Sequence, residues 1–303
     1  MDVTNKYTKI MPVPVFAEIP ETYTVSPEQY KFYWDNGYLV IKELIDFATV
    51  YSCKQRFTQY AKGILKPGNS TLVREPELLK KGLTGEDAIN KIQDILYDDV
   101  FMTYTENPRL LNVVSQFIGD NLTAVHSMFI NKPPGTGRHP THQDLYYFPF
   151  RPADKIIAAW TAIDHITFDN GCMYVLPGSH KHGQIFPHVN SDDPKALYHG
   201  VVNEDSVAPK DERVHLEMSP GDTLFMHSLL LHGSEANVTK RYRKSVSCHY
   251  ANSECEYVDV YNGVQDHIAR SVEKLAKSRG FDVSFVDQWR MRSKLVKGVK
   301  CNL

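Results

Sequence analysis

The sequence predicts a mainly β fold, a sandwich or jelly roll with helices flanking it at both ends, and three observations lead to this prediction. From about residue 122 to 250, short apolar runs alternate with turns that contain Gly, Pro or Asn, a texture typical of antiparallel strands. Helix signals are confined to residues 26–118 and about 264–294. No repeat or low-complexity linker divides the 303 residues, so we expect one domain over residues 21–303.

The amino-terminal part is expected to begin as an extended arm and to continue as helices. Residues 1–20 show no helical period and contain Pro12 and Pro14 among β-branched residues, which favours an extended chain. A helix should begin after Ser26, because Ser26 can cap it, Pro27 suits its first position and Gln29 completes a capping box. A short strand is expected at residues 38–41. Further helices are expected at about residues 45–63, 86–97 and 107–118.

The jelly-roll core is expected to consist of strands separated by turns. A strand over residues 124–130 leads into Pro133-Pro134-Gly135, and one over residues 155–164 leads into Asp169-Asn170-Gly171. The second turn is typical of a β-hairpin, which predicts a returning strand over residues 172–176. Further strands are expected at residues 223–231 and 243–250, and helices at residues 264–279 and 284–294.

Composition excludes several classes of protein. Hydrophobic residues make up 42% and charged residues 23% of the chain, which is ordinary for a folded soluble protein. A formal net charge of -2 leaves no broad basic field that would attract nucleic acids. Five cysteines without a C-x-x-C pair argue against a disulfide scaffold or a cysteine zinc site. With no apolar run of ~18 residues and no secretory leader at Met1, we expect an intracellular monomer without a membrane span.

A possible metal site begins with His142 and Asp144, which lie two residues apart. If this segment is extended, both side chains point to the same face and can bind one metal ion. An isolated His-x-Asp pair more often lies in a solvated loop, so a third ligand is needed. His232, at the end of the apolar run 224–231, is the best candidate. Two histidines and one carboxylate form the facial triad of non-haem Fe(II) oxygenases, which leaves three coordination positions open.

An arginine beyond His232 would complete such a site. The co-substrate 2-oxoglutarate chelates iron through its 2-oxo acid end, and its distal carboxylate needs a buried partner, which a guanidinium provides with two charge-assisted hydrogen bonds. Arg241 and Arg243 follow His232, and spacing alone does not choose between them. Ser234 could add a hydroxyl group to the same carboxylate. For either arginine taken alone, a solvent-exposed charge on a strand is the simpler interpretation.

The region around these residues resembles the phytanoyl-CoA dioxygenase family of Fe(II)/2-oxoglutarate oxygenases. The likeness extends from about residue 20 to the end of the chain. It is carried by the segments His142–Pro152, Ile130–Pro134, Ala159–Ala162, Asn170–Cys172, Val175–Gly178, Arg213–Leu216, Gly221–Thr223, His232–Ser234, Arg243–Lys244, Ser247–His249 and Leu295–Gly298.

The resemblance implies a double-stranded β-helix, a variant of the jelly roll, and a full set of site residues. It implies iron at His142, Asp144 and His232. It implies Fe(II) as cofactor, 2-oxoglutarate as co-substrate and ascorbate as an optional reductant. The residues it places on 2-oxoglutarate are Arg243 rather than Arg241, with Ser234 and Trp160, and also Lys91 and Met128. From pattern alone, Lys91 would be a solvated lysine on a helix and Met128 a strand residue of the core.

The activity that the resemblance implies is 2-hydroxylation of a branched-chain fatty acyl-CoA in fatty-acid α-oxidation. Partners would then be acyl-CoA, 2-oxoglutarate and O2. Because coenzyme A carries three phosphates, we expect cationic side chains at the pocket mouth, and Arg138, Arg151 and Lys155 flank the metal motif. The alternatives are the same chemistry on a different small molecule and a non-catalytic acyl-CoA-binding jelly roll. A halogenase is disfavoured because Asp144 is present, and a zinc hydrolase because it has no use for the arginine.

Two features limit what the resemblance implies. Residues 135–141 are fewer than expected for the family and border the metal motif, so the acyl-chain preference is left open. The family implies a peroxisomal location, but residues 301–303 depart from the Ser-Lys-Leu address and residues 9–17 only approximate an amino-terminal signal. The cytosol is therefore the alternative. His180 is expected to have a structural role in a turn. His227 is expected to lie in the core or face solvent, because strand parity places it on the other side from His232.

Overall fold

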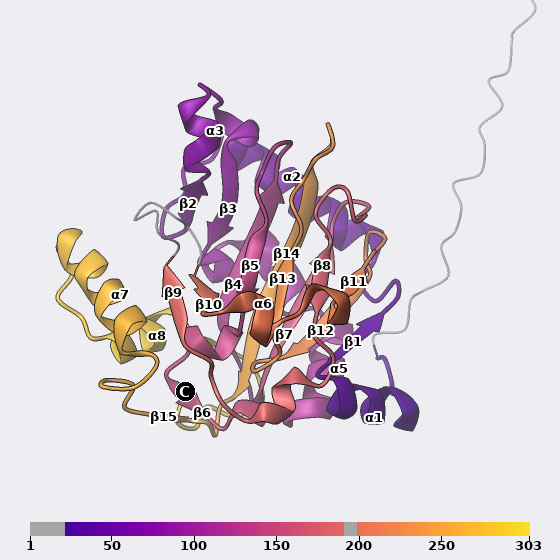
Figure 1. Cartoon of the computed structure of the whole chain (residues 1–303), viewed down its shortest axis with the longest axis vertical. Helices are drawn as coiled ribbons and strands as arrows, with labels where there is room; N and C mark the ends of the chain where they lie inside the picture. The colour runs from indigo at the N-terminus through magenta and orange to yellow at the C-terminus, as the bar shows by residue number, and fades with distance from the viewer. Residues whose placement is uncertain (1–21, 191–198) are drawn as a thin grey trace, which may run out of the picture.

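The computed structural model describes residues 22–190 and 199–303 and shows a jelly roll of two facing sheets with helices around it (Figure 1). The strand pairings of both sheets within the described residues are antiparallel, so the predicted mainly β fold with flanking helices is confirmed. The extended arm predicted for residues 1–20 lies outside the described residues. No helix in the described ranges is both long and apolar enough to cross a membrane.

The larger sheet has the strand order β1-β12-β7-β14-β4-β3-β2, and β16 pairs with one end of β4. Its centre is β14, which is bonded along most of its length by β7 on one side and β4 on the other. The strands are β1 (Tyr38–Ile41), β2 (Thr71–Arg74), β3 (Ile89–Gln93), β4 (Leu122–Lys132), β7 (Ile156–Ala162), β12 (Thr223–His227), β14 (Arg243–Asn252) and β16 (Lys294–Lys297).

The smaller sheet faces the larger one and has the order β11-β8-β13-β5. Two further pairs, β9 with β10 and β6 with β15, lie outside these sheets. The strands are β5 (His139–His142), β6 (Phe150–Arg151), β8 (Met173–Val175), β9 (His188–Asn190), β10 (His199–Val201), β11 (Val214–Leu216), β13 (His232–Ser234) and β15 (Glu256–Tyr257).

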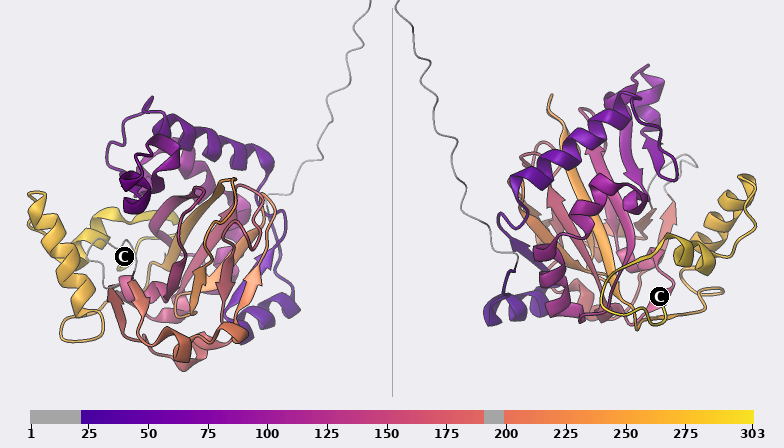
Figure 2. Two further views of the ribbon diagram at one scale, coloured as in Figure 1. Left: turned by 45° about the horizontal axis from the view of Figure 1, so that its top comes forward. Right: turned by 180° about the vertical axis from the view of Figure 1, so that it is seen from behind.

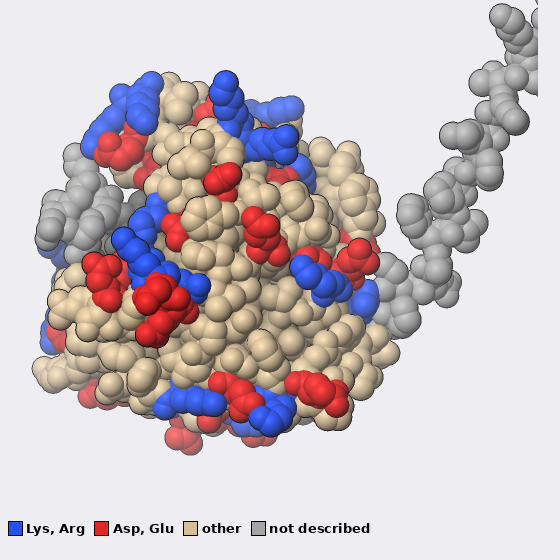
Figure 3. Space-filling model, turned by 45° about the vertical axis from the view of Figure 1, so that its right-hand side comes forward, with Lys and Arg blue, Asp and Glu red and all other residues tan. Residues whose placement is uncertain are grey.

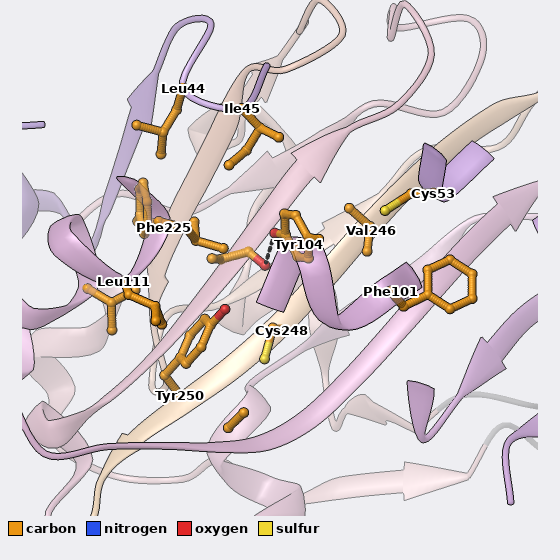
Figure 4. Packing of buried hydrophobic residues seen from close by; sticks show 14 of the residues in the cluster. Leu44, Ile45, Cys53, Phe101, Tyr104, Leu111, Phe225, Val246, Cys248 and Tyr250 are labelled. Carbon is orange, nitrogen blue, oxygen red and sulfur yellow. Dashed lines mark hydrogen bonds between the residues drawn. The ribbon is translucent and has the colours of Figure 1, made fainter. Parts of the chain in front are cut away.

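Helices cover the outer face of the larger sheet, as the view from behind in Figure 2 shows. Buried side chains of α2, α4 and α5 pack against alternate residues of β12, β7 and β14. Figure 4 shows this packing, with Cys53, Phe101, Tyr104 and Leu111 from the helices against Phe225, Val246, Cys248 and Tyr250 from the strands. The helices are α1 (Pro27–Asn36), α2 (Phe47–Ala61), α3 (Pro76–Lys80), α4 (Asp99–Thr105), α5 (Pro108–Ile118), α6 (Glu204–Val207), α7 (Asp266–Ser278) and α8 (Phe285–Arg292).

Because side chains alternate along a strand, β14 presents a different set of residues to the inside of the jelly roll. Its even-numbered residues Val246 and Cys248 belong to the helix-covered core. Its odd-numbered residues, from Arg243 to His249, therefore face the smaller sheet. Trp160 and Leu224, on β7 and β12, fill part of this inner space together with residues of β8. The inner face of β14 is polar, whereas its outer face is apolar.

The structure corrects the helix predicted over residues 86–97. The centre of this region is β3, which pairs with β2 and β4. Short 3-10 turns at residues 85–87 and 95–97 flank the strand. Ile89 and Ile92 are buried in the helix-covered core, while Lys91 lies opposite Ile130, which packs with the residues of the inner face. A local apolar period typical of a helix is here overruled by pairing with a strand distant in the sequence.

The structure also corrects two strand connections. The turn at residues 169–171 does not form the predicted hairpin, because β7 and β8 belong to different sheets. The predicted strand over residues 223–231 ends at His227, and His232 instead begins β13 in the other sheet. Arg241 precedes β14 and is exposed. The connection from β7 to β8 and the connection from β12 to β13 each lead from one sheet to the other, as a jelly roll requires.

The surface carries small groups of opposite charges. On the face in Figure 3, basic and acidic side chains lie close together around a broad uncharged area. Among the described residues on this face there is no extended field of a single sign, in keeping with the net charge of -2.

The capping box predicted at α1 is present. Ser26 Oγ accepts from the Gln29 backbone N–H at 3.2 Å, and Gln29 Oε1 accepts from the Ser26 backbone N–H at 3.0 Å. We expect Ser26→Ala to lower the free energy of unfolding by about 1 kcal/mol, because the Gln29 backbone N–H loses its acceptor, Ser26 Oγ. Urea unfolding followed by circular dichroism measures this change. Thr24→Ala, at an exposed residue two positions before Ser26, is the control. An equal loss of unfolding free energy in both variants would contradict the prediction.

Candidate metal centre

Three predicted ligands meet between the two sheets. His142 ends β5 and His232 begins β13, and the two residues are directly opposite each other in the pairing of these strands. Asp144 follows two residues after His142, at the start of a 3-10 turn. The candidate ligand atoms of the three residues lie within 4.8 Å of one another, and all three side chains are buried. The structure therefore brings together the His-x-Asp pair and the distant histidine.

Backbone carbonyls orient both imidazole rings. Nδ1 of His142 lies 3.0 Å from the Pro140 carbonyl oxygen, and Nδ1 of His232 lies 2.9 Å from the Leu230 carbonyl oxygen. Each Nδ1 therefore donates, which leaves Nε2 as the lone-pair nitrogen directed at Asp144. Nε2 of each ring lies 3.6 Å from Oδ1 of Asp144. This arrangement presents three ligand atoms in the form that a metal ion needs.

The electrostatics of the cluster suit a divalent cation. Burial alone would raise the pKa of Asp144, but His249, His232 and His142 outweigh it and hold the pKa well below its usual range. Burial lowers the pKa of His232 to about 4, with a further contribution from His142. The cluster thus contains an ionised carboxylate and an imidazole that stays neutral at physiological pH. Two imidazoles and one carboxylate are a donor set that binds Fe(II), Zn(II) and similar ions.

The inner face of the larger sheet holds the residues implied for the co-substrate. Register pairs Ser247 of β14 with Met128 of β4 and with Trp160 of β7, so the three lie in one row across the sheet. Lys91 lies in the next row, opposite Ile130 of β4. Burial lowers the pKa of Lys91 to about 8, an effect partly offset by Glu75. Lys91 is thus a half-buried strand residue and not the solvated helix residue that its local pattern suggested.

Arg243 occupies the same face and is almost fully buried, with 2% of its surface exposed. Its Nε donates to the Gly171 carbonyl oxygen at 3.0 Å, and its Nη1 donates to Ser245 Oγ at 3.3 Å. Its guanidinium carbon lies 5.4 Å from the centroid of the Trp160 ring. A buried guanidinium in this setting requires anionic or polar partners. Arg241, by contrast, is exposed.

Lys132, directly opposite Arg243 in register, ties Ser234 into this region. Its Nζ donates to Ser234 Oγ at 3.1 Å, to the Gly137 carbonyl oxygen at 3.0 Å and to the Glu235 carbonyl oxygen. Burial and the charge of Arg243 hold the pKa of Lys132 well below its usual range. Lys132 therefore joins β4 of the larger sheet to β13 and to residues 135–141, and it was not among the predicted residues.

A buried hydroxyl group supports the fit of a polar ligand here. Ser247 is 2% exposed, and its Oγ has no hydrogen-bond partner among the described residues. Since buried polar atoms are nearly always paired, this hydroxyl is available to a ligand or to ordered water. It lies between Met128 and Trp160 on the face that carries Arg243. The residues present therefore fit both a metal ion and a carboxylate-bearing co-substrate.

The three predicted cationic substrate contacts are not gathered at one place. Arg138 lines a hollow of about 550 Å³ and is paired there with Glu204. Arg151 lines a different hollow of about 690 Å³, and its guanidinium donates to the carbonyl oxygens of Phe148 and Phe150. Lys155 is exposed and lines neither hollow. The guanidinium groups of Arg138 and Arg151 therefore already have polar partners within the protein.

His180 and His227 have structural partners, in line with their expected roles. His180 Nε2 lies 3.1 Å from the Trp34 carbonyl oxygen, and His227 Nε2 lies 3.0 Å from Asp154 Oδ1. The residue that pattern reading missed is His249, whose Nε2 lies 3.0 Å from Asp144 Oδ2. The available signal was its even spacing from Arg243 on one strand, which places both on the same face.

The chain is similar to a set of known enzymes. The family profile described as phytanoyl-CoA dioxygenase (PhyH) matches residues 33–245. The peroxisomal phytanoyl-CoA dioxygenase of Rattus norvegicus is 42% identical over 293 residues, which cover 92% of this chain and 85% of the relative. The probable phytanoyl-CoA dioxygenase of Caenorhabditis elegans is 43% identical, with 92% and 95% covered. The peroxisomal phytanoyl-CoA dioxygenase of Homo sapiens is 42% identical, with 91% and 84% covered.

Solved structures of lower identity share the fold. EctD from S. alaskensis in its apoform superposes with a TM-score of 0.63 at 20% identity, covering 80% of this chain and 81% of that chain. The non-heme alpha ketoglutarate dependent epimerase SnoN superposes with a TM-score of 0.58 at 20% identity, covering 77% and 82%. These likenesses concern the architecture and agree with the jelly roll described above.

Proposed function

This chain belongs to the phytanoyl-CoA dioxygenase family, and we propose that it 2-hydroxylates a branched-chain fatty acyl-CoA with Fe(II), 2-oxoglutarate and O2. The products would be a 2-hydroxyacyl-CoA, succinate and CO2, which is a step of fatty-acid α-oxidation. The observation that carries the proposal is the buried set of His142, Asp144 and His232 beside an inner sheet face that bears Arg243.

His142, Asp144 and His232 would hold the iron. When bound there, Fe(II) couples oxidative decarboxylation of 2-oxoglutarate to hydroxylation of a carbon–hydrogen bond. The chain's own contribution is orientation. The carbonyls of Pro140 and Leu230 hold the two imidazole rings, and burial of the three ligands excludes bulk water from the centre.

Arg243 and Ser234 would bind the distal carboxylate of 2-oxoglutarate. The guanidinium supplies charge and direction, and the Ser234 hydroxyl group adds one more hydrogen bond. Trp160 would pack against the co-substrate from the next strand, where its ring already lies beside the Arg243 guanidinium. Lys91 and Met128 would line the same pocket from β3 and β4.

Lys132 would support this binding indirectly, through Ser234. We expect Lys132→Met to raise the KM for 2-oxoglutarate about fivefold, the factor that corresponds to about 1 kcal/mol, because the Ser234 hydroxyl group and two carbonyl oxygens lose their donor. Steady-state kinetics with varied 2-oxoglutarate measures this change. Lys240→Met, at an exposed lysine, is the control and should leave the KM unchanged. An unchanged KM in Lys132→Met would contradict the role.

The substrate is proposed to be a thioester and not the free acid. A large polar head held at a fixed place sets the distance to the α-carbon, which favours attack there over attack at a remote methylene. Some of the cationic side chains of Arg138, Arg151 and Lys155 would then bind the phosphates of coenzyme A. For the two arginines, this binding would replace the contacts that they make within the protein.

The test uses iron-loaded protein with O2, 2-oxoglutarate and a panel of branched and straight-chain acyl-CoAs and their free acids. We expect succinate and a 2-hydroxyacyl-CoA to form in equal amounts with the thioesters and little product with the acids. Succinate release coupled to a free acid or a non-lipid substrate, with the thioesters inert, would favour the same chemistry on a different small molecule. Binding of acyl-CoA without any decarboxylation would favour a non-catalytic jelly roll.

A peroxisomal location is proposed from the names of the vertebrate relatives. Residues 9–17 lie outside the described residues. At the other end, Leu303 is buried, and the backbone N–H groups of Asn302 and Leu303 donate to the Ser253 carbonyl oxygen. Fluorescence microscopy of the tagged chain tests the location: coincidence with a peroxisomal marker is expected, and a diffuse signal would assign it to the cytosol.

A further inference from the structure

We propose that His249 is a positioning residue of the metal centre, which holds one oxygen of Asp144 and so leaves only the other oxygen to face the metal. The inference rests on the proposed function, because it takes His142, Asp144 and His232 as the ligands. It adds a fourth side chain, from the larger sheet, to a centre whose ligands come from the smaller sheet and the turn after it.

The two carboxylate oxygens of Asp144 have different partners. Oδ1 lies 3.6 Å from Nε2 of His142 and 3.6 Å from Nε2 of His232. Oδ2 lies 3.0 Å from Nε2 of His249. Because Oδ1 faces both ligand nitrogens, it is the oxygen that a shared metal ion would take. Oδ2 is already bound on the other side.

The direction of the hydrogen bond follows from the chemistry of the carboxylate. An ionised carboxylate oxygen can only accept, so Nε2 of His249 carries the hydrogen and donates it to Asp144. Nδ1 of His249 has no hydrogen-bond partner among the described residues. The contact with Asp144 is therefore the only hydrogen bond of this imidazole ring within the described ranges. A histidine buried for packing alone would not need this orientation.

The backbone and the neighbouring rings fix the position of His249. Its strand, β14, pairs on both sides, with His126 of β4 and Ala158 of β7 as the register partners of His249. The His126 ring stacks against it with centroids 5.6 Å apart, and the Phe148 ring meets it edge-on at 5.2 Å. The imidazole therefore cannot follow the carboxylate if Asp144 rotates, and the hydrogen bond resists that rotation.

The consequence concerns the number of open coordination positions. A carboxylate that binds through both oxygens occupies two positions of a six-coordinate ion, whereas one that binds through a single oxygen leaves three positions free beside two histidines. A chelating 2-oxo acid takes two of these and O2 needs the third. By holding Oδ2, His249 would keep that third position available and would raise metal affinity by pre-orienting Oδ1.

The first measurement is metal affinity in the absence of substrate. The metal-free chain is titrated with Co(II) under anaerobic conditions, with His142→Ala as the reference for a lost ligand. Wild-type protein should bind one Co(II) per chain, and His142→Ala should lose this binding. His249→Leu, which removes the donor, should bind Co(II) about 10- to 100-fold more weakly, the range typical for outer-sphere partners of metal ligands.

A matched pair of polar variants separates the hydrogen bond from general damage. The amide nitrogen of His249→Gln can occupy the place of Nε2, whereas that of His249→Asn falls short of Asp144. We expect His249→Gln to keep the wild-type Co(II) affinity within about threefold and His249→Asn to lose about as much affinity as His249→Leu. His126→Phe keeps a flat ring against His249 and should bind Co(II) like wild type. This pair keeps the test informative if His249→Leu does not fold.

A second readout reports the open positions. Fe(II) with a chelating 2-oxo acid gives a visible charge-transfer band, so anaerobic titration with 2-oxoglutarate follows chelation directly. The band should weaken in His249→Asn at saturating iron and persist in His249→Gln. The inference would be overturned if His249→Leu and His249→Asn both bound Co(II) with wild-type affinity and kept the charge-transfer band. If His142→Ala lost Co(II) binding in the same experiments, the metal centre itself would stand. Wild-type Co(II) binding by His142→Ala would instead overturn the ligand assignment itself.

Discussion

Replacing Asp144 with alanine is expected to abolish coupled succinate and hydroxyacyl-CoA formation while the chain stays folded. Asp144 supplies the only carboxylate among the three buried ligand side chains. Its removal leaves two imidazoles, which carry no negative charge to balance a divalent ion, and it leaves the donor of His249 unpaired. The jelly roll itself should persist, because a chain of this length buries a core large enough to fold without a metal ion.

Three measurements on Asp144→Ala separate these effects. Succinate and hydroxyacyl-CoA are quantified together, and circular dichroism checks the fold. Thermal unfolding with and without Co(II) reports binding, because an ion that binds only the folded state raises Tm. Wild-type protein should show that rise and Asp144→Ala should not. Asp169→Ala, at an exposed carboxylate, is the control. Near wild-type hydroxylation by Asp144→Ala would remove Asp144 from the metal centre.

Arg243→Ala is expected to raise the 2-oxoglutarate requirement by more than tenfold. Loss of one partner of a buried charge-assisted pair costs roughly 2–5 kcal/mol, partly because the other charge is left unpaired, and each ~1.4 kcal/mol corresponds to a factor of ten. Arg243 is almost fully buried, whereas Arg241 is exposed before the strand begins. Arg241→Ala should therefore have a small effect.

The effect of Arg243 is best resolved by a series of variants. Arg243→Lys keeps the positive charge but loses the planar fork, so its KM for 2-oxoglutarate should lie between those of wild type and Arg243→Ala. Because Arg243 also donates to Gly171 and Ser245, unfolding curves must show that the variants remain folded. If Arg241→Ala, and not Arg243→Ala, raised the KM, the assignment of the co-substrate arginine would be wrong.

Much of the fold follows from local patterns. Alternation of apolar residues predicted the core strands, and the capping box at Ser26 predicted the start of α1, because both signals depend on residues only a few positions apart. The spacing of His142 and Asp144 likewise predicted that their side chains could share a face. The pairing of His232 with His142 across β13 and β5 agrees with the choice of His232, although the strand assigned to it was wrong.

The errors arise where partners are distant in the sequence. Residues 86–97 carry an apolar period that suits a helix, and only pairing with β4 makes them a strand. The turn at residues 169–171 has a hairpin composition, but the strands on either side pair with others that lie 39 or more positions away in the sequence. Lys91 and Lys132 were misjudged or missed for the same reason, since the burial of a lysine depends on what packs over it.

The polar inner face of β14 carries both the proposed co-substrate arginine, Arg243, and the proposed positioning residue of the metal centre, His249. Arg243 at its beginning and His249 near its end point the same way because they lie six positions apart on the strand. A single-residue insertion or deletion between them would turn one of the two away from the site. Changes of length should therefore be confined to the loops, and the tolerance of this enzyme to insertions can be mapped by a scan along residues 240–255. The scan should find no tolerated insertion between residues 243 and 249.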